Sequence, residues 1–252
     1  KDLHYGEVLY YFYQEDYLTA ITKLLASRQL GRTPNHEIDS ELLLGGMDIS
    51  YGLHKEAGRI FKRLLDGNAE QRIRNRAWYY LGKISYQRGY LDQAEDYLRR
   101  MSGVLGNEMR GDRQLLLAQV LMAKRRYSEA TAVLQAWEGP ANWKPYAQFN
   151  LGLALIRSGQ RDQGMHILEQ VGSMAAQNRE QDALKDRANL VLGYTLIKDG
   201  KPSRARAHLK HVRLHGPYSN MALLGTGWAN AELKTYQQAL VVWSELQERD
   251  VI

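Results

Sequence analysis

The stretch Trp78-Tyr79-Tyr80-Leu81-Gly82, followed by Gly89-Tyr90 and then by Ala94 and Leu98, carries the spacing that decides the fold. The small residue Gly82 is followed twelve positions later by a second small residue and, four positions further on, by a large apolar one. Small side chains let two helices approach each other closely, and a large side chain one turn later fills the groove between them. The glycine between the two segments is a typical turn residue. The stretch therefore predicts a helical hairpin.

The same spacing recurs seven times along the 252 residues. The first small residue of each unit reads Val8, Gly45, Gly82, Ala118, Gly152, Gly193 and Gly227, and the second reads Ala20, Ala57, Ala94, Ala130, Gly164, Ala205 and Ala239. The large apolar residue is Leu24, Phe61, Leu98, Leu134, Leu168, Leu209 and Trp243. A helical hairpin cannot bury its apolar face alone, so a nearly fixed period of this length indicates hairpins that stack on one another.

The residues of the third unit resemble the signature of the tetratricopeptide repeat (TPR) family, through Trp78, Leu81 and Gly82, then Tyr90 and Ala94. Pro217 ends the sixth unit and resembles the closing proline of that signature. The resemblance extends over essentially the whole chain, which is also similar to long exported bacterial TPR scaffold proteins. It implies an all-α fold, an α-solenoid of about seven TPR helix-turn-helix units forming a right-handed superhelix. Val8 and Gly164 depart from the usual residues.

We expect one continuous array over residues 1–252, with units at about 1–34, 36–68, 72–105, 111–139, 144–172, 182–215 and 218–252. The interval between Val171 and Arg187 is longer than the others by roughly two helical turns, which predicts lengthened helices or a local change of superhelix pitch. Lys1 begins almost within the first helix, and the last helix, which ends near Ile252, is apolar on more than one side. We therefore expect a longer protein, or a partner at the last helix.

The composition excludes several classes of protein. With 44% hydrophobic and 25% charged residues the chain is a folded protein. The net charge of +6 is spread among nearly as many acids, which predicts a solvated surface and disfavours nucleic acid as a partner. No cysteine is present, and this fits a periplasmic location as well as a cytoplasmic one. We expect the periplasm, with membrane proximity depending on sequence upstream of Lys1.

No residue pattern predicts catalysis. A base beside a nucleophile, paired carboxylates and phosphate-binding glycine loops are all missing from the sequence, so we expect no enzyme activity and no cofactor. His208, His211 and His215 have the spacing of one helical face, where they could bind a metal or respond to pH. Their cationic neighbours Arg204 and Lys210 oppose a dication, so no metal site is predicted.

The family resemblance implies that the first helices of successive units line a concave groove. Tyrosine and arginine are enriched in binding hot spots, and at helical spacing about half of such aromatics are expected to be packing residues. Chaperone-type recognition of a peptide carboxylate is disfavoured, because Leu9, Gly46 and Leu153 stand where that pattern needs polar residues. The predicted partner-binding residues are Tyr5, Phe12, Arg76, Tyr79, Lys83, Tyr86, Gln119, Tyr146, Phe149, Asn150, Arg187, Tyr194 and Trp228.

Two functional hypotheses follow from this groove. The first is a non-catalytic scaffold or adaptor that binds a partner protein or peptide, with a bacterial cell-envelope assembly as its setting. The second is a saccharide-handling TPR domain of an exopolysaccharide export system, because tyrosine and tryptophan rings stack on sugar rings.

Overall fold

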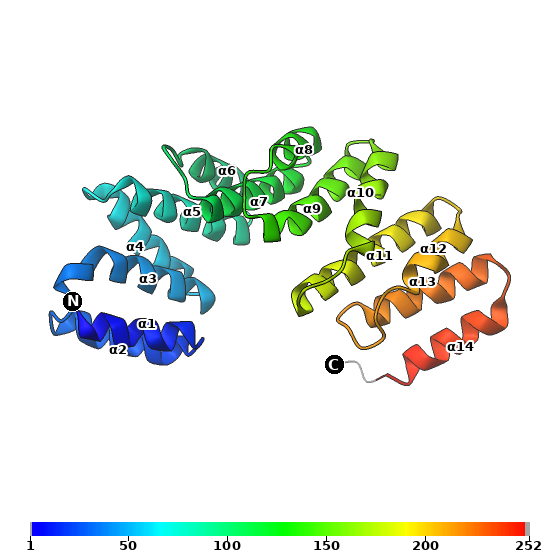
Figure 1. Cartoon of the computed structure of the whole chain (residues 1–252), viewed down its shortest axis with the longest axis horizontal. Coiled ribbons are helices and arrows are strands. Elements are labelled where there is room, and N and C mark those ends of the chain that lie inside the picture. The colour runs from blue at the N-terminus through cyan, green and yellow to red at the C-terminus, as the bar shows by residue number, and fades with distance from the viewer. Residues whose placement is uncertain (1, 250–252) are drawn as a thin grey trace. The chain divides into compact units, whose positions relative to one another are not determined.

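The computed structural model describes residues 2–249, so Lys1 and residues 250–252, which belong to the predicted first and last units, lie outside the described part. Every regular element in residues 2–249 is helical (Figure 1). The α-helices are α1 (Leu3–Tyr13), α2 (Tyr17–Gln29), α3 (Glu37–Ser50), α4 (His54–Asp66), α5 (Gln71–Gln87), α6 (Leu91–Arg99), α7 (Asn107–Ala123), α8 (Tyr127–Gln135), α9 (Lys144–Arg157), α10 (Arg161–Ser173), α11 (Arg179–Lys198), α12 (Pro202–Leu209), α13 (Ser219–Glu232) and α14 (Tyr236–Gln247). Two short 3₁₀ helices are η1 (Pro34–His36) and η2 (Ala141–Trp143).

Consecutive helices pack as pairs, as the repeat predicts. The contacts join α1 to α2, α3 to α4, α5 to α6, α9 to α10, α11 to α12, and α13 to α14. The first helix of a pair also contacts the first helix of the next pair, as in α3 with α5 and α11 with α13. This arrangement confirms the all-α, TPR-like solenoid fold.

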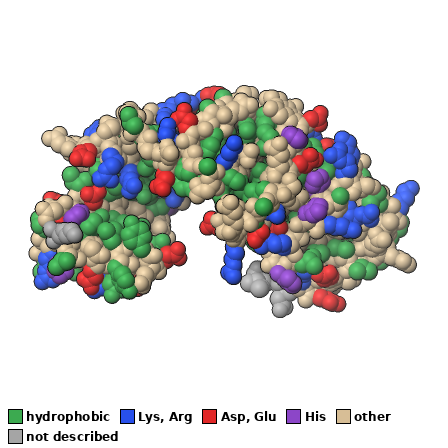
Figure 2. Space-filling model, viewed as in Figure 1, with side chains coloured by type: hydrophobic (Ala, Val, Ile, Leu, Met, Phe, Trp, Pro, Cys, Tyr) green, Lys and Arg blue, Asp and Glu red, His purple; other side chains and the backbone are tan. Residues whose placement is uncertain are grey.

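The chain forms two compact units, residues 1–124 and 125–252. The first contains α1 to α7 and buries a core in which Leu24 and Phe61 are fully buried. The second contains α8 to α14, and its core includes the fully buried Leu168 and Leu192. On the face shown in Figure 2, acidic and basic side chains are interspersed over both units, as expected for a solvated surface.

The predicted small and large residues meet inside the helix pairs. A Cβ atom built on Gly82 would lie 3.0 Å from Leu98 Cγ, and one on Gly193 would lie 2.5 Å from Leu209 Cγ. Gly45 faces Phe61 in the same way at 2.7 Å. The large residue of each of these pairs therefore occupies the space that the missing side chain leaves, which is the contact that the twelve-plus-four spacing predicts.

The turn between the two helices of a pair has a left-handed residue seven positions after the first small residue. Gly52, Gly89, Gly159 and Gly200 hold this position with positive φ. In the other three of the seven repeats a residue with a side chain adopts the same conformation: Glu15 at φ 62°, Arg125 at φ 60° and Lys234 at φ 60°. Because this conformation is costly for L-residues and not for glycine, these three turns carry local strain.

The long interval after the fifth unit lengthens a helix. α10 ends at Ser173, and α11 begins at Arg179 and runs for 20 residues, the greatest length of any helix in the described part of the chain. The Asn178 side chain caps its start by accepting a hydrogen bond from the backbone N–H of Gln181 at 2.9 Å. The expected lengthening is therefore confirmed for α11.

The predicted histidine face does not form, because α12 ends at Leu209. His208 is helical, whereas His211 and His215 lie in the turns that follow. The buried Asp186 carboxylate accepts hydrogen bonds from the Arg213 backbone N–H at 3.2 Å and from Arg213 Nε at 2.8 Å. These bonds hold the chain in a non-helical path, so the three histidines share no helical face.

None of the helices in residues 2–249 has both the length and the apolar character that crossing a membrane requires.

Candidate functional site

All thirteen predicted binding residues lie on first helices of the pairs, and twelve of them are at least partly exposed. Arg76, Arg187 and Trp228 are exposed. Tyr5 and Phe12 are partly buried and pack against the core of the first unit, so part of their surface serves packing, as expected. The remaining partly exposed residues are Tyr79, Lys83, Tyr86, Gln119, Tyr146, Asn150 and Tyr194.

Phe149 is a correction to the predicted set, because only 1% of its surface is exposed. It stands three positions before the small residue Gly152, and the apolar residues Leu42 and Leu190 at the equivalent position are also buried. The guanidinium carbon of Arg187 lies 4.8 Å from the centre of the Phe149 ring. Phe149 therefore supports the exposed Arg187 by a cation–π contact and offers no surface to a partner.

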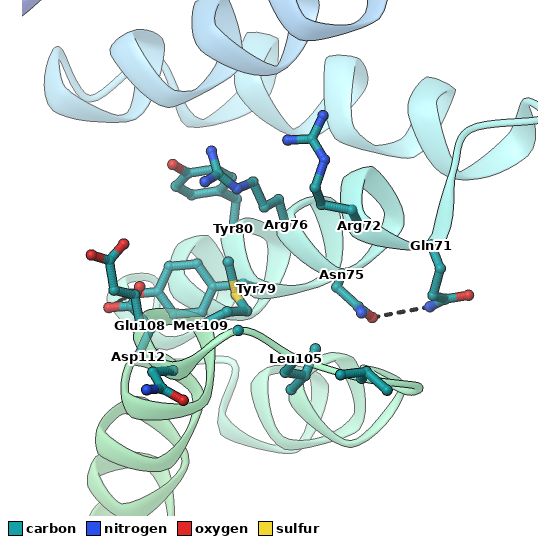
Figure 3. A pocket seen from close by; sticks show the side chains of 13 residues that line it. Gln71, Arg72, Asn75, Arg76, Tyr79, Tyr80, Leu105, Glu108, Met109 and Asp112 are labelled. Atoms are coloured by element: carbon teal, nitrogen blue, oxygen red, sulfur yellow. Dashed lines mark hydrogen bonds between the residues drawn. The ribbon is translucent and has the colours of Figure 1, made fainter. Parts of the chain in front are cut away.

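A cleft of about 630 Å³ lies in the first compact unit, residues 1–124, between α5, the loop before α7 and the first turns of α7 (Figure 3). It brings together two of the predicted residues, Arg76 and Tyr79, but not Lys83 or Tyr86. The other lining residues are Gln71, Arg72, Asn75, Tyr80, Val104, Leu105, Gly106, Asn107, Glu108, Met109 and Asp112.

The loop that forms one side of the cleft is tied to α5 by a buried amide. Asn75 is 3% exposed, and its side chain donates to the Ser102 carbonyl at 2.9 Å. The same side chain accepts hydrogen bonds from the Ser102 backbone N–H at 3.1 Å and from Gln71 Nε2 at 3.0 Å. Because the two bonds to Ser102 fix the start of the loop, and the bond from Gln71 holds the amide in place, Asn75 positions Val104 and Leu105, the apolar residues that border the cleft.

The aromatic floor of the cleft comes from Tyr79 and Tyr80. The Tyr80 ring stacks on the buried Phe61 ring with 4.9 Å between their centres. Burial raises the pKa of both tyrosines, with the Asp112 charge adding to the effect, so both hydroxyls stay protonated and can donate hydrogen bonds at neutral pH. Tyr79 donates to Asp112 Oδ1 at the long distance of 3.4 Å.

The acidic wall of the cleft is the start of α7. Asp112 lies one helical turn after Glu108, and both line the cleft. Burial raises the pKa of Asp112, while the Tyr79 hydroxyl and the charges of Lys83 and Arg76 oppose that shift. The Asp112 carboxylate is therefore partly shielded from solvent, and within residues 2–249 it accepts only one weak hydrogen bond.

The basic wall of the cleft is the start of α5. Arg72 forms an ion pair with Asp39 of α3 at 3.1 Å. Arg76 forms neither a hydrogen bond nor an ion pair with any residue of the described part, although its charge lowers the pKa values of Tyr80 and Asp112. Its guanidinium is therefore available to a ligand.

Sequence reasoning missed Asp112, which stands at the same repeat position as Arg76. Asp39, Arg76 and Asp112 each precede the first small residue of their unit by six positions. They place alternating charges on the neighbouring first helices α3, α5 and α7. Aligning the second, third and fourth repeats on their small residues brings these three charges to one position, so the signal was present in the sequence.

In the second compact unit, the first helix α13 exposes an apolar surface. Met221, Leu224 and Trp228 follow helical spacing on α13 and are 51%, 39% and 52% exposed. Tyr194 of α11 donates its hydroxyl to the Met221 carbonyl at 2.8 Å, so this tyrosine links two first helices. Tyr146 of α9 reaches Glu180 Oε2 at 3.5 Å in the same manner, and Asn150 donates to the Tyr146 carbonyl at 2.9 Å.

A polar cavity of the second compact unit surrounds His208, and its lining includes Glu169, Lys185, Asn189 and His211. His208 Nε2 lies 3.8 Å from Glu169 Oε1. Burial lowers the pKa of His208, and the neighbouring charges of His211 and Arg204 add to this, whereas Glu169 opposes it. No group of three or more histidine, aspartate or glutamate side chains within residues 2–249 could hold a metal ion.

Comparison with known proteins supports the repeat assignment. Residues 190–243 match the family model described as tetratricopeptide repeat. Similar solved structures include the apo form of RapI, with 12% identity and a TM-score of 0.75 over 97% of this chain and 74% of that one. A tetratricopeptide repeat protein from Parabacteroides merdae matches with 13% identity and a TM-score of 0.64 over 97% and 93% of the two chains.

The quorum sensor NprR from B. thuringiensis is also similar, in its apo form, with 12% identity and a TM-score of 0.64 over 98% of this chain and 76% of that one. NprR in complex with its cognate peptide NprX matches with 12% identity and a TM-score of 0.52 over 96% and 76% of the chains. No curated protein matches this chain in sequence. At these identities the structures show a shared fold, that of TPR proteins.

Proposed function

We propose that this TPR-repeat chain is a non-catalytic scaffold that binds a peptide or an extended segment of a partner protein on its first helices. The cleft between α5 and α7 is the main contact. The observation that carries the proposal is Arg76, an exposed guanidinium, unpaired within residues 2–249, beside the aromatic floor of Tyr79 and Tyr80. A similar fold, that of NprR, is known in complex with a cognate peptide.

The chemistry of the cleft suits an extended peptide. Its walls offer charged groups, its floor offers tyrosine rings, and its border carries Val104 and Leu105. Large amphipathic rings and arginine dominate binding energies at protein interfaces, because they bury much surface and form directed hydrogen bonds. A peptide presents side chains of both kinds along one backbone, so it can use the whole cleft.

Selection from a display library of random heptapeptides on the purified chain tests this function. We expect enriched peptides whose affinity falls about tenfold or more in Arg76→Met, because truncating a hot-spot residue costs about 2 kcal/mol or more. Arg59→Met is the matched control, since Arg59 is 76% exposed on α4 and lies outside the cleft. Equal binding to wild type and Arg76→Met would refute the assignment of the cleft.

A saccharide is the second candidate ligand, and the exposed ring of Trp228 is the observation that favours it. The Trp243 ring meets the Trp228 ring at an angle of 71° with 5.5 Å between the ring centres. Trp228 is nevertheless 52% exposed, so it offers a surface on which a sugar can stack. Oligosaccharide arrays probed with wild type and Trp228→Ala decide between the two. Glycan binding that depends on Trp228, together with no enriched peptide, would replace the peptide proposal.

We place the scaffold in a bacterial cell-envelope assembly, in the periplasm, with the cytoplasm as the alternative. The support is the sequence resemblance to long exported TPR proteins, and the absence of cysteine is compatible with both compartments. Fractionation of the native cells, with one periplasmic and one cytoplasmic marker protein, separates the two. Recovery with the cytoplasmic marker would remove the envelope from the proposal.

A further inference from the structure

Two opposite charges face the α5–α7 cleft without pairing with each other. Arg76 comes from α5 and Asp112 from the equivalent position of α7, one repeat later. Arg72 of α5 forms an ion pair with Asp39 of α3 at 3.1 Å. Within the described residues, no such ion pair joins Arg76 of α5 to Asp112 of α7. The partly buried Asp112 carboxylate gains most from a charged partner. The exposed Arg76 guanidinium can still form a charge-assisted hydrogen bond, so each of the two groups can gain from a ligand of opposite charge.

The acidic half of the cleft suits a guanidinium or ammonium group. Asp112 and Glu108 supply carboxylates from the same face of α7, and the Tyr79 ring lies beside them (Figure 3). A cation in this place can form a charge-assisted hydrogen bond to the carboxylate and lie against the tyrosine ring. The Tyr79 hydroxyl is the current partner of Asp112, and its 3.4 Å bond is weak enough to be displaced.

The basic half of the cleft suits a carboxylate. Arg76 presents a planar guanidinium, which matches the two oxygens of a carboxylate in a bidentate pair. Figure 3 shows Arg76 beside the Tyr80 ring, on the α5 side of the cleft and across from Glu108 and Asp112. The Tyr80 ring is held by stacking on Phe61, so this side of the cleft is preformed.

We propose that the cleft selects a bipolar peptide segment, which places a basic side chain against Asp112 and an acidic side chain against Arg76. The proposal rests on the peptide-binding function proposed above and adds the charge pattern of the ligand. A segment that crosses from α5 to α7 meets first the positive wall and then the negative one, with the tyrosine floor beneath its backbone. A segment with two charges of the same sign would satisfy one wall and be repelled by the other.

Short synthetic peptides test this pattern directly. Acetylated and amidated peptides carry one arginine and one glutamate, separated by zero, one or two glycines. In each spacing the arginine is replaced by citrulline, the glutamate by glutamine, or both. Binding is followed through the ¹³C-labelled methyl group of Met109, which lines the cleft. For at least one spacing we expect a saturable shift and an affinity about tenfold higher for the bipolar peptide than for either singly neutral one, which corresponds to about 1.4 kcal/mol.

Variants assign each charge to its wall. In Asp112→Asn the preference for arginine over citrulline should disappear while the preference for glutamate over glutamine remains. In Arg76→Met the opposite loss is expected. Asp162→Asn on α10 and Arg59→Met on α4 change the same residue types outside the cleft, so they should leave all affinities unchanged. Thermal unfolding of each variant shows whether it is folded.

The outcomes separate this inference from the proposed function. If peptides from the display library bind through Arg76 but no spacing discriminates arginine from citrulline, the scaffold function stands and the bipolar pattern is wrong. If Asp112→Asn and Arg76→Met each weakened binding of the bipolar, singly neutral and doubly neutral peptides by the same factor, the pattern would also be overturned, because this would show a steric effect and not charge recognition. If neither the library nor the synthetic peptides bind, both proposals fail.

Discussion

The repeat spacing makes a sharp prediction for Gly193, the first small residue of the sixth unit. In Gly193→Ala the new Cβ would lie 2.5 Å from both Leu209 Cγ and Leu209 Cδ2. Leu209 is only 2% exposed, so its side chain has little room to move aside. Overpacking of this kind costs about 1–3 kcal/mol. Replacing glycine by alanine within a helix returns about 0.8–1 kcal/mol. The balance predicts a free energy of unfolding lower by about 0–2 kcal/mol, because the packing cost equals or outweighs the gain in helix propensity.

Gly58 in α4 is the matched control, since a Cβ built there meets no atom within 4 Å. Gly58→Ala should therefore raise the free energy of unfolding by about 0.5–1 kcal/mol, through helix propensity alone. The free energy of unfolding of both variants is measured in urea, with circular dichroism as the signal. Repeat arrays can unfold in parts, so amide hydrogen exchange in α11 and α12 accompanies the measurement.

A second variant tests the contact itself. In the presence of Leu209→Ala the clash disappears, so Gly193→Ala should then be neutral or stabilising, with a coupling energy of about 1 kcal/mol between the two sites. If Gly193→Ala stabilises the wild-type chain as much as Gly58→Ala does, the small-and-large account of the repeat is refuted.

Three further perturbations probe the turns, the cleft and the histidine cavity. Lys234→Gly removes the cost of a side chain at φ 60° and should raise the free energy of unfolding by about 0.5–1 kcal/mol; lower stability in urea would contradict this. Asn75→Ala leaves buried partners unsatisfied and should lower the free energy of unfolding by about 1–3 kcal/mol. Relative to wild type, amide exchange should accelerate more in residues 102–106 than in α6, and unchanged exchange would show that Asn75 does not hold the loop. The folded pKa of His208 is lowered, so the unfolded chain binds more protons and stability should fall as pH drops below about 6.5; His208→Gln should reduce that slope in urea unfolding at pH 5 to 8, and an identical slope would refute it.

The sequence by itself determined the repeat and the faces of its helices. Spacing within one hairpin depends only on helix geometry, so the pairing of Gly82 with Leu98 follows from the order of residues alone. The same periodicity placed Arg76 and Tyr79 on first helices, and both line one cleft. Left-handed turns were readable where glycine marks them. They were not readable at Glu15, Arg125 and Lys234, because these residue types rarely adopt a positive φ.

Contacts between neighbouring repeats were decided only by the tertiary structure. Asp112 joins the cleft because α7 packs beside α5, and hairpin spacing says nothing about which side chains of two stacked first helices approach each other. Phe149 turns inward and leaves Arg187 exposed above it, although its repeat position is shared with the partly exposed Tyr79. The end of α12 likewise depends on Asp186, which is 27 residues away from Arg213 in the chain. Local periodicity fixes which face a residue occupies, whereas burial and charge pairing depend on what the next repeat brings to that face.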